Sequence, residues 1–436
     1  MRSGPLDYVL ALLIAAGFAA VGETVLRRAS ASLAQWNSSL VAGMGACAAL
    51  LFPLSLVAGR RALDLTLGLM GLCAATTVWR RLRRREASAG GSEVARAAWL
   101  PLAIAALAAA AFAVLDWRYN LLWDGFAAWA SKAQRLFVEG GLTRTWYPGD
   151  SYDSRYVSYP PLVPLYEALV SRLRGRFDFG GLKPVFLVFY VSMAGSVYAA
   201  VRARASARLA AWAVALVLFV PALSTRWAAG AYADMPQAAV VAAVVAAAMR
   251  SDAAALPWLL GALTTVKPEG MILALIAAVA IAAATRLRGI RLGAVAAIAA
   301  FVAVRVAYLR WTGVREDTYL FRSVGFAIER APEVARLCLR ELLDPSAWGL
   351  LWPAFLAAAV VGWRMGDAKQ RSLAAAVAAG ILAMAAPFLF TTWPLELHVS
   401  QAYFRLLAQL APAAVVAAVL AWGRAWERWA LPPPAA

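Results

Sequence analysis

Long apolar stretches separated by short polar segments recur along the whole chain. Each is roughly 17 to 22 residues long, enough at about 1.5 Å per residue to cross a hydrocarbon core of about 30 Å. Lipid forces the backbone to satisfy its own hydrogen bonds, and these Ala/Leu/Val runs do not alternate as barrel strands do, so helices are expected. The pattern predicts an all-α, polytopic transmembrane bundle of about thirteen spans, near residues 6–26, 38–58, 63–79, 97–115, 183–202, 208–224, 234–249, 253–266, 269–285, 291–309, 347–363, 371–390 and 404–422.

Two long polar connections, residues 116–160 and 310–345, interrupt this series. Short arginine-rich loops stay cytoplasmic, whereas these two connections carry acidic and basic side chains in similar numbers. We therefore expect both connections, and any site on them, on the outer face of the cytoplasmic membrane. Arg60 and Arg61 conflict with this rule, because the predicted spans 38–58 and 63–79 place the connection between them on the outer side. The residues that mark the cytoplasmic loops are Arg80, Arg81, Arg83, Arg84 and Arg85; Arg202, Arg204 and Arg208; Arg286, Arg288 and Arg291; and Arg364, Lys369 and Arg371.

Composition narrows the function classes. The net charge of +18 does not indicate a nucleic-acid partner, because no stretch is large and polar enough to form a water-exposed domain. The three cysteines, Cys47, Cys73 and Cys338, suggest no disulfide framework. The single histidine, His398, cannot build an imidazole-rich metal site, and no nucleotide-binding loop is seen. No metal and no cofactor are therefore expected.

The first long connection contains a predicted amphipathic helix from Trp123 to Gly141. Helical spacing places Asp124, Ala128, Ser131, Lys132 and Arg135 on one face and Phe126, Trp129, Ala130, Ala133 and Phe137 on another. Such a helix is expected to lie in the membrane interface with its charged face toward water. An ordinary solvated face is the alternative to a functional one.

Other ionisable groups lie close to span ends, where charges are costly and mark candidate functional sites. Asp234 precedes a span and has an N-cap as its simple explanation. Lys267 and Glu269 lie at the tip of a tight helical pair, where Lys267 can meet a lipid phosphate or pair with Glu269. Arg405 lies about one turn into the last span, where it can snorkel or bind a phosphate. Tyr159 belongs to a YPP segment that anchors or positions the first connection.

Taken together, the Asp124 helix, the YPP segment, YADMP around Asp234, the KPEG turn and the late FRLLAQLAP segment resemble bacterial GT-C glycosyltransferases. The similarity is to the branch of the aminoarabinose and protein mannosyl transferases, and it covers residues 97–425. Residues 1–96 are then additional N-terminal transmembrane helices, and residues 426–436 a cytoplasmic tail.

The resemblance implies transfer of a sugar from a polyprenyl-phosphate donor to a lipid, glycan or protein acceptor at the outer face of the membrane. Asp124 matches the aspartate of the family's Asp-Glu pair, but Gly125 stands in place of the second acid. Asp234 matches a second outer acidic motif, and Lys267 and Glu269 match a Lys-x-Glu-Gly element.

These matches suggest roles for the candidate residues. Asp124 or Asp234 is the expected base, and the expected phosphate partners are Lys132, Arg135, Lys267 and Arg405. Tyr159 and Glu269 complete the predicted substrate-binding set. If this prediction is right, Asp124, Asp234 and Lys267 must converge, because proton transfer needs near-contact geometry. A transporter or lipid flippase and a non-catalytic membrane assembly subunit are the alternative functions.

Overall fold

The computed structural model describes residues 3–28, 30, 32–83, 95–143, 159–224, 229–285, 288–313, 327–391 and 393–430. Every regular element in these ranges is a helix, which confirms the predicted all-α class. The principal helices are α1 (Pro5–Val25), α2 (Leu33–Ala58), α3 (Ala62–Arg83), α4 (Ala95–Arg118), α5 (Ser131–Glu139), α6 (Leu162–Arg174), α7 (Pro184–Arg202), α8 (Ala207–Leu218), α9 (Pro221–Ser224), α11 (Asp234–Arg250), α12 (Leu256–Leu263), α13 (Gly270–Ala284), α14 (Arg288–Thr312), α15 (Ala331–Leu342), α16 (Pro345–Trp348), α17 (Leu351–Met365), α18 (Ala368–Ala385), α19 (Leu395–Ala408) and α20 (Ala411–Ala430).

Short irregular turns of helix connect several of these elements. They are a π-helical segment (Gly125–Ala130) and the 3₁₀ turns Gly59–Arg61, Phe179–Leu182, Ile328–Arg330 and Ala386–Phe390.

The helices support a multi-pass membrane protein, but not the predicted number of spans. In the described part of the chain, six helical stretches are long and apolar enough to cross a membrane, or seven if the bent pair α19 and α20 counts as one span. Three shorter apolar helices, α8, α13 and α17, add to them. The expected count of about thirteen is therefore not confirmed. The six stretches are Pro5–Val25, Ala34–Arg81, Trp99–Arg118, Phe179–Arg202, Arg291–Thr312 and Ala368–Phe390.

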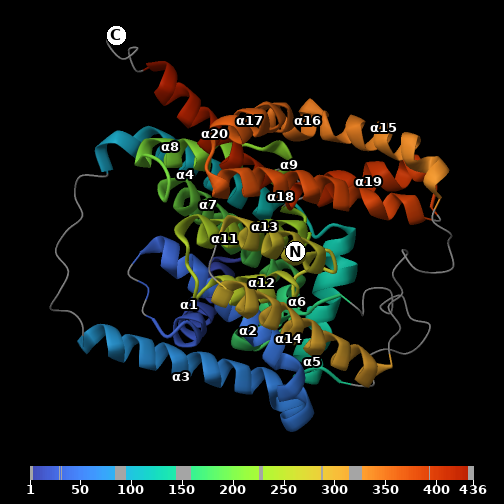
Figure 1. Ribbon diagram of the computed structural model, residues 1–436. Helices are drawn as coiled ribbons and strands as arrows, with labels where there is room; N and C mark the ends of the chain where they lie inside the picture. Colours follow the sequence, from blue (N-terminus) through green and yellow to red (C-terminus); the bar gives the residue numbers. More distant parts are fainter. Residues whose placement is uncertain are drawn as a thin grey trace.

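The helix α11 lies at the centre of the bundle. All but its last turn is buried, and it packs on α7, α12 and α20. Figure 1 shows α11, α13 and α18 side by side in the middle, with α3 at the lower edge and α17 and α20 at the upper edge. Small side chains on α11 allow this close packing, as is usual between membrane helices.

The N-terminal helices share the same core. At the α1–α2 contact a side chain on Gly22 would overlap the backbone of Ser39, and one on Gly43 would overlap the backbone of Phe18. Both glycines therefore let the two backbones touch. Because α1 and α2 also pack on α7, residues 1–96 are continuous with the rest of the bundle in space, and their status as a separate unit stays a prediction.

The two termini of α11 mark the two ends of the bundle. At the Asp234 end of α11, the amide of Leu63 donates to the carbonyl of Gly140 at 2.9 Å, and Arg60 pairs with Glu139 at 3.6 Å. Arg60 and Arg61 thus lie beside the first long connection, as the predicted spans placed them. Ion pairs gather at the other end, where Arg250 lies: Arg28 with Asp252, and Arg204 and Arg424 with Asp367.

Several sequence predictions fall outside the described residues. These are Arg84, Arg85, Arg286, residues 144–158 of the first long connection, residues 314–326 of the second, and residues 431–436 of the predicted tail.

Candidate functional site

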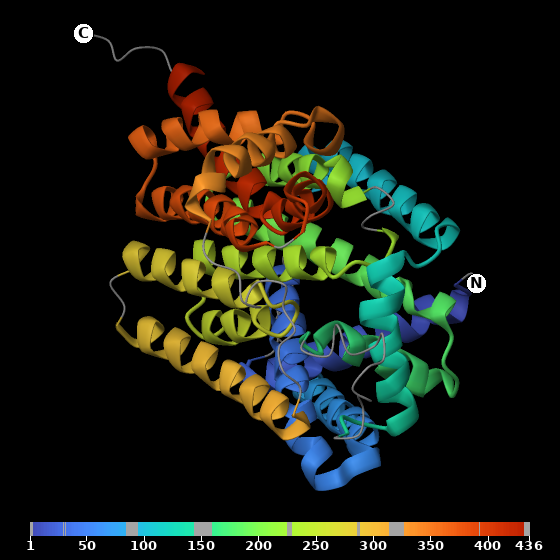
Figure 2. The same ribbon diagram turned by 90° about the vertical axis from the view of Figure 1, so that its right-hand side faces the viewer.

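The segment after Trp123 forms the predicted helix, but not with the predicted faces. Its first part is π-helical and continues into α5, which runs across the direction of the bundle helices in both views (Figures 1 and 2). Lys132 is buried, whereas Phe126 is 49% exposed. The expected water-facing position of Lys132 is therefore wrong, because α5 packs on α6 and turns this side chain inward. A π-turn directly after Asp124 is typical of functional sites.

The packing around Gly125 leaves no room for the second acid of the family's motif. A side chain at this position would overlap the carbonyl oxygen of Gly230 and lie 3.2 Å from the Cβ atom of Ala231. The amide of Leu122 also donates to the Gly230 carbonyl, at 3.1 Å. The two backbones are thus in direct contact, and this contact brings Asp124 beside the start of α11.

Asp234 is the first residue of α11, and Ala233 occupies its N-cap position. The capping interpretation is therefore wrong. The Asp234 carboxylate instead accepts hydrogen bonds from Lys267 Nζ at 2.7 Å, Gln409 Nε2 at 2.9 Å and Arg405 Nε at 3.1 Å. The preceding loop includes Ala231 with φ of +67°, a backbone conformation that non-glycine residues seldom adopt outside constrained sites.

Lys267 lies in the turn between α12 and α13 and is 5% exposed. Its ammonium group also lies 3.3 Å from the carboxylate of Glu269, as one of the two predicted alternatives expected. Burial alone lowers the pKa of Lys267, but the charges of Asp234 and Glu269 outweigh it, so the pKa of Lys267 is raised. Lys267 therefore stays protonated and holds Asp234 in place.

Arg405 joins the two aspartates. Its Nη2 donates to Asp124 Oδ2 at 2.6 Å and its Nε to Asp234 Oδ2 at 3.1 Å, while its guanidinium lies 4.2 Å from the centre of the Tyr232 ring. Arg405 occupies the last turn of α19, before a 54° bend into α20, and not the first turn of a straight last span as predicted. Because the side chain points to the carboxylates, snorkelling does not explain it.

Five predicted residues therefore converge at one end of the bundle: Asp124, Asp234, Lys267, Glu269 and Arg405. We call them the acid–base cluster. Its three carboxylates and two cations have a formal net charge of −1. A cavity of about 20 Å³ lies against Asp234 and Arg405. Among the described residues, no group of three or more His, Cys, Asp or Glu side chains is placed to hold a metal ion.

The other three predicted residues lie outside the cluster. Lys132 Nζ donates to the backbone carbonyl of Tyr159, whose ring lies 5.4 Å from that of Trp129. Burial, assisted by the nearby charge of Arg305, lowers the pKa of Lys132 to about 7. Arg135 lies on the exposed side of α5.

Sequence reasoning missed three residues at or near these groups. Gln409 follows Arg405 by one helical turn, and this spacing is the only signal for it. Tyr232 carries no charge and is a usual interface residue, so nothing singled it out. Arg305 lies within the predicted span 291–309, and an arginine at that depth was a detectable signal.

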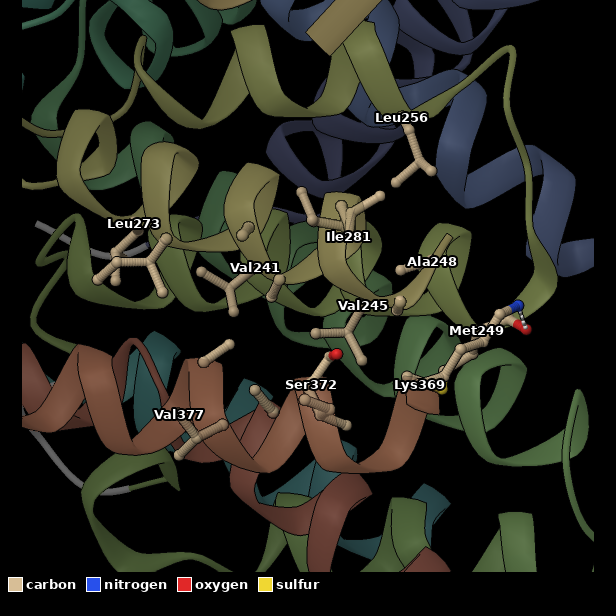
Figure 3. Close-up of a pocket in the computed structure, with 18 of the residues that line it drawn as sticks. Val241, Val245, Ala248, Met249, Leu256, Leu273, Ile281, Lys369, Ser372 and Val377 are labelled. Carbon is tan, nitrogen blue, oxygen red and sulfur yellow. Dashed lines mark hydrogen bonds between the residues drawn. The ribbon is translucent and has the colours of Figure 1, made fainter. Parts of the chain in front are cut away.

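An apolar cavity of about 90 Å³ lies between α11, α13 and α18. Figure 3 shows Val241 and Val245 of α11 and Ile281 of α13 among the side chains that line it, with Val377 and Ser372 of α18 across from the two valines. Its near end includes Leu263, four residues before Lys267, and its far end reaches Lys369. Lys369 donates to the carbonyl of Met249 at 3.0 Å.

Comparisons with known proteins found structures but no sequence relatives. No family model and no curated protein matches the sequence. The oligosaccharyltransferase AglB of Archaeoglobus fulgidus, in complex with an inhibitory peptide and a dolichol-phosphate, is similar with a TM-score of 0.45 and 12% identity, over 76% of this chain and 51% of that chain. A crystal structure of the oligosaccharyltransferase of the same organism, tethered to an acceptor peptide with an NVT sequon, is similar with a TM-score of 0.47 and 12% identity. This match covers 77% of this chain and 51% of that chain.

This chain thus spans about half the length of these structures. Both are oligosaccharyltransferases.

Proposed function

We propose that this chain is a GT-C-type glycosyltransferase that moves a sugar from a polyprenyl-phosphate donor to an acceptor at the outer face of the cytoplasmic membrane. The observation that carries the proposal is the Arg405 bridge. One guanidinium at a bundle end holds two carboxylates, Asp124 and Asp234, at 2.6 and 3.1 Å. Membrane-embedded charges are costly to bury, so an arrangement joined from distant parts of the chain indicates function.

Asp124 is the better placed base. Asp234 is 5% exposed, and its two oxygens already accept from Lys267, Gln409 and Arg405. The Asp124 side chain is 21% exposed, and Arg405 contacts its Oδ2. Its Oδ1 can then accept a proton from an acceptor hydroxyl, while Asp234 acts as a positioning residue that orients Arg405.

The proposed step balances without a cofactor. The acceptor oxygen attacks the anomeric carbon of the sugar and forms the new C–O bond, while the bond from that carbon to the phosphate oxygen breaks. The acceptor proton passes to Asp124, and the bonding electron pair leaves with the polyprenyl phosphate. Neutralisation of the charge on that phosphate lowers the barrier.

The apolar cavity supports the lipid character of the donor. It begins one turn from the KPEG segment and is lined mainly by aliphatic side chains of α11, α13 and α18 (Figure 3). A polyprenyl chain whose phosphate lies near the acid–base cluster can extend into it. Burial of apolar surface in this cavity contributes about 25 cal/mol per Å² to the binding free energy if the chain displaces water, and less if it displaces lipid.

The test is turnover of a defined donor. Wild-type protein in liposomes that contain a polyprenyl-phosphate sugar should release polyprenyl phosphate when acceptor lipids or peptides are supplied. Arg405→Met removes the bridge and should lower turnover by about 100-fold or more, since charged hydrogen-bond partners of reacting groups contribute at that level. Arg336→Met, on an exposed pair with Glu333, is the matched control and should keep full turnover. Equal turnover by both variants would refute the proposal.

A further inference from the structure

A large groove lies on the side of the bundle that α8, α17 and α20 form. Both α8 and α17 pack on α20, and the three helices lie together at the upper edge of the molecule in Figure 1. The groove has a volume of about 880 Å³, within the range of about 300 to 1,000 Å³ that is usual for ligand pockets. Among its described lining residues, none belongs to the acid–base cluster.

The walls of the groove are mainly apolar and open toward the membrane. Leu216 and Phe219 of α8 line one wall and are 54% and 56% exposed. Leu350, directly before α17, lines the other wall and is also exposed. Small side chains of α20, such as Ala418, lie between them. A molecule in this groove therefore contacts aliphatic and aromatic side chains and is reached from the lipid.

The length of the groove matches one leaflet of the membrane. Its lining residues run from Arg208 to Phe219 along α8 and from Val415 to Trp426 along α20. Each run covers about 16 Å at about 1.5 Å per residue. This is roughly half of a hydrocarbon core of about 30 Å, which a transmembrane helix of a partner protein would have to cross completely. The groove thus fits an acyl chain better than a partner helix.

One end of the groove is positively charged. Arg208 lines this end with an exposed side chain, and no residue in the described part of the chain forms a hydrogen bond or ion pair with it. Four residues earlier, Arg204 shares the carboxylate of Asp367 with Arg424, so that this single acid faces two arginines. The charge of Arg208 therefore remains available to an anion. This end lies opposite the acid–base cluster, on the side that the arginine-rich loops predict to be cytoplasmic.

Tryptophan side chains lie close to this charge. Trp212 follows Arg208 by one helical turn, and Trp422 and Trp426 line the same groove from α20. Tryptophan rings are enriched at the level of lipid headgroups. Basic pockets between transmembrane helices on the cytoplasmic side are typical binding sites of anionic lipids, and an arginine fork suits a phosphate. The groove thus offers a cation, aromatic rings and an apolar channel in the order of a phospholipid's headgroup, interface and acyl chain.

We propose that this groove is a binding site for one anionic phospholipid of the cytoplasmic leaflet. The phosphate of its headgroup lies at Arg208, and one acyl chain lies along α20 between α8 and the start of α17. The site goes beyond the proposed glycosyl transfer and does not depend on it, because it is at the other end of the bundle and needs no sugar donor.

The test compares phosphatidylglycerol with phosphatidylcholine of the same acyl chains. Each lipid is titrated into the detergent-purified full chain, and bound lipid is counted by native mass spectrometry. Wild type should bind phosphatidylglycerol at least about fivefold more tightly, the size of effect expected for one arginine near an anionic lipid. Arg208→Gln should reduce this preference to less than about twofold. Arg80→Gln, an exposed arginine near the same end of α3 on the opposite edge of the bundle, is the matched control and should keep the preference.

A second pair of variants tests the groove itself. Leu216→Trp fills the groove from an exposed position and should weaken binding of phosphatidylglycerol by about tenfold, since loss of contact with two methylene groups already has an effect of that size. Val360→Trp, at an exposed position of α17 outside the groove, should bind like wild type. Melting curves check the fold of every variant.

Three results would overturn the proposal. Equal binding of the two lipids by wild type would show that the groove does not select an anionic lipid. Wild-type binding and preference in either folded variant, Arg208→Gln or Leu216→Trp, would place the lipid elsewhere. A wild-type dimer that Leu216→Trp dissociates would identify a second copy of the chain as the occupant. None of these measurements uses sugar transfer, so failure of this proposal and failure of the proposed function are separate results.

Discussion

At the residue scale, the sequence identified the charged members of the site but not their partners. Asp124, Asp234, Lys267, Glu269 and Arg405 stood out because ionisable groups beside a membrane are costly. Their pairing could not be predicted, since 281 positions separate Asp124 from Arg405 and no local pattern links them. Gln409 and Tyr232 escaped notice because neutral side chains give no such signal.

Gly125 gives a test of the backbone contact that positions Asp124. Gly125→Ala should destabilise the fold by about 1 to 3 kcal/mol, because the added methyl group would overlap the Gly230 carbonyl and force the backbone apart. Thermal melting in detergent measures this. Gly68→Ala, in a helix where a Cβ atom meets nothing within 4 Å, should instead leave stability unchanged or slightly higher. A Gly125→Ala variant as stable as Gly68→Ala would contradict the close contact.

At the element scale, the sequence predicted that a segment forms a helix, but not which neighbours each face of the helix contacts. Helical periodicity correctly indicated a helix after Trp123, yet a pattern of charges cannot tell a water-facing side from one that packs on α6. Likewise, the apolar run 404–422 read as one span. The chain bends there by 54° at a break after Ala408, before the start of α20 with Pro412 in its first turn.

The orientation of α5 predicts a pH effect on stability. The pKa of Lys132 is about 7 in the folded protein, against an ordinary value of 10.5, because of burial and the nearby Arg305. Between these values the unfolded chain holds a proton that the folded protein has lost, so stability should rise with pH from about 7 upward. The melting temperature of wild type should therefore rise more between pH 7 and pH 9 than that of Lys132→Met. Parallel pH profiles would show that Lys132 is not buried in this way.

At the scale of the whole molecule, composition predicted a multi-pass helical membrane protein, and the helices agree. The number of spans could not be read from hydropathy, because short apolar helices such as α8, α13 and α17 resemble spans in sequence. The convergence of Asp124, Asp234 and Lys267 was predicted as a requirement of catalysis, and the fold meets it.

Orientation in the membrane remains a prediction with a direct test. Native Cys47, Cys73 and Cys338 are buried, so single added cysteines can be labelled over a low background. Val138→Cys lies on the exposed side of α5 at the cluster end and should react with an impermeant thiol reagent on intact cells. Ala253→Cys, in the exposed turn after α11 at the opposite end, should react only after lysis. The reverse pattern would place the cluster on the cytoplasmic face.

Asp124 is the residue on which the account as a whole depends. Asp124→Asn keeps the size of the side chain and removes its basicity. Loss of a positioned base typically lowers rate by about 100- to 10,000-fold, whereas loss of the charge on one side of the partly exposed Asp124–Arg405 ion pair is expected to lower stability by only about 1 kcal/mol. Asp234→Asn removes the charge that pairs with Lys267 and Arg405 and replaces one accepting oxygen by an NH₂ group, so it should lower both turnover and melting temperature.

The decisive measurement is the rate of sugar transfer by purified Asp124→Asn, normalised to folded protein and compared with wild type. The account predicts a fall of at least about 100-fold, with a melting temperature that is lowered by less than that of Asp234→Asn. A rate within about threefold of wild type would contradict the assignment of Asp124 as the base and would transfer that role to Asp234.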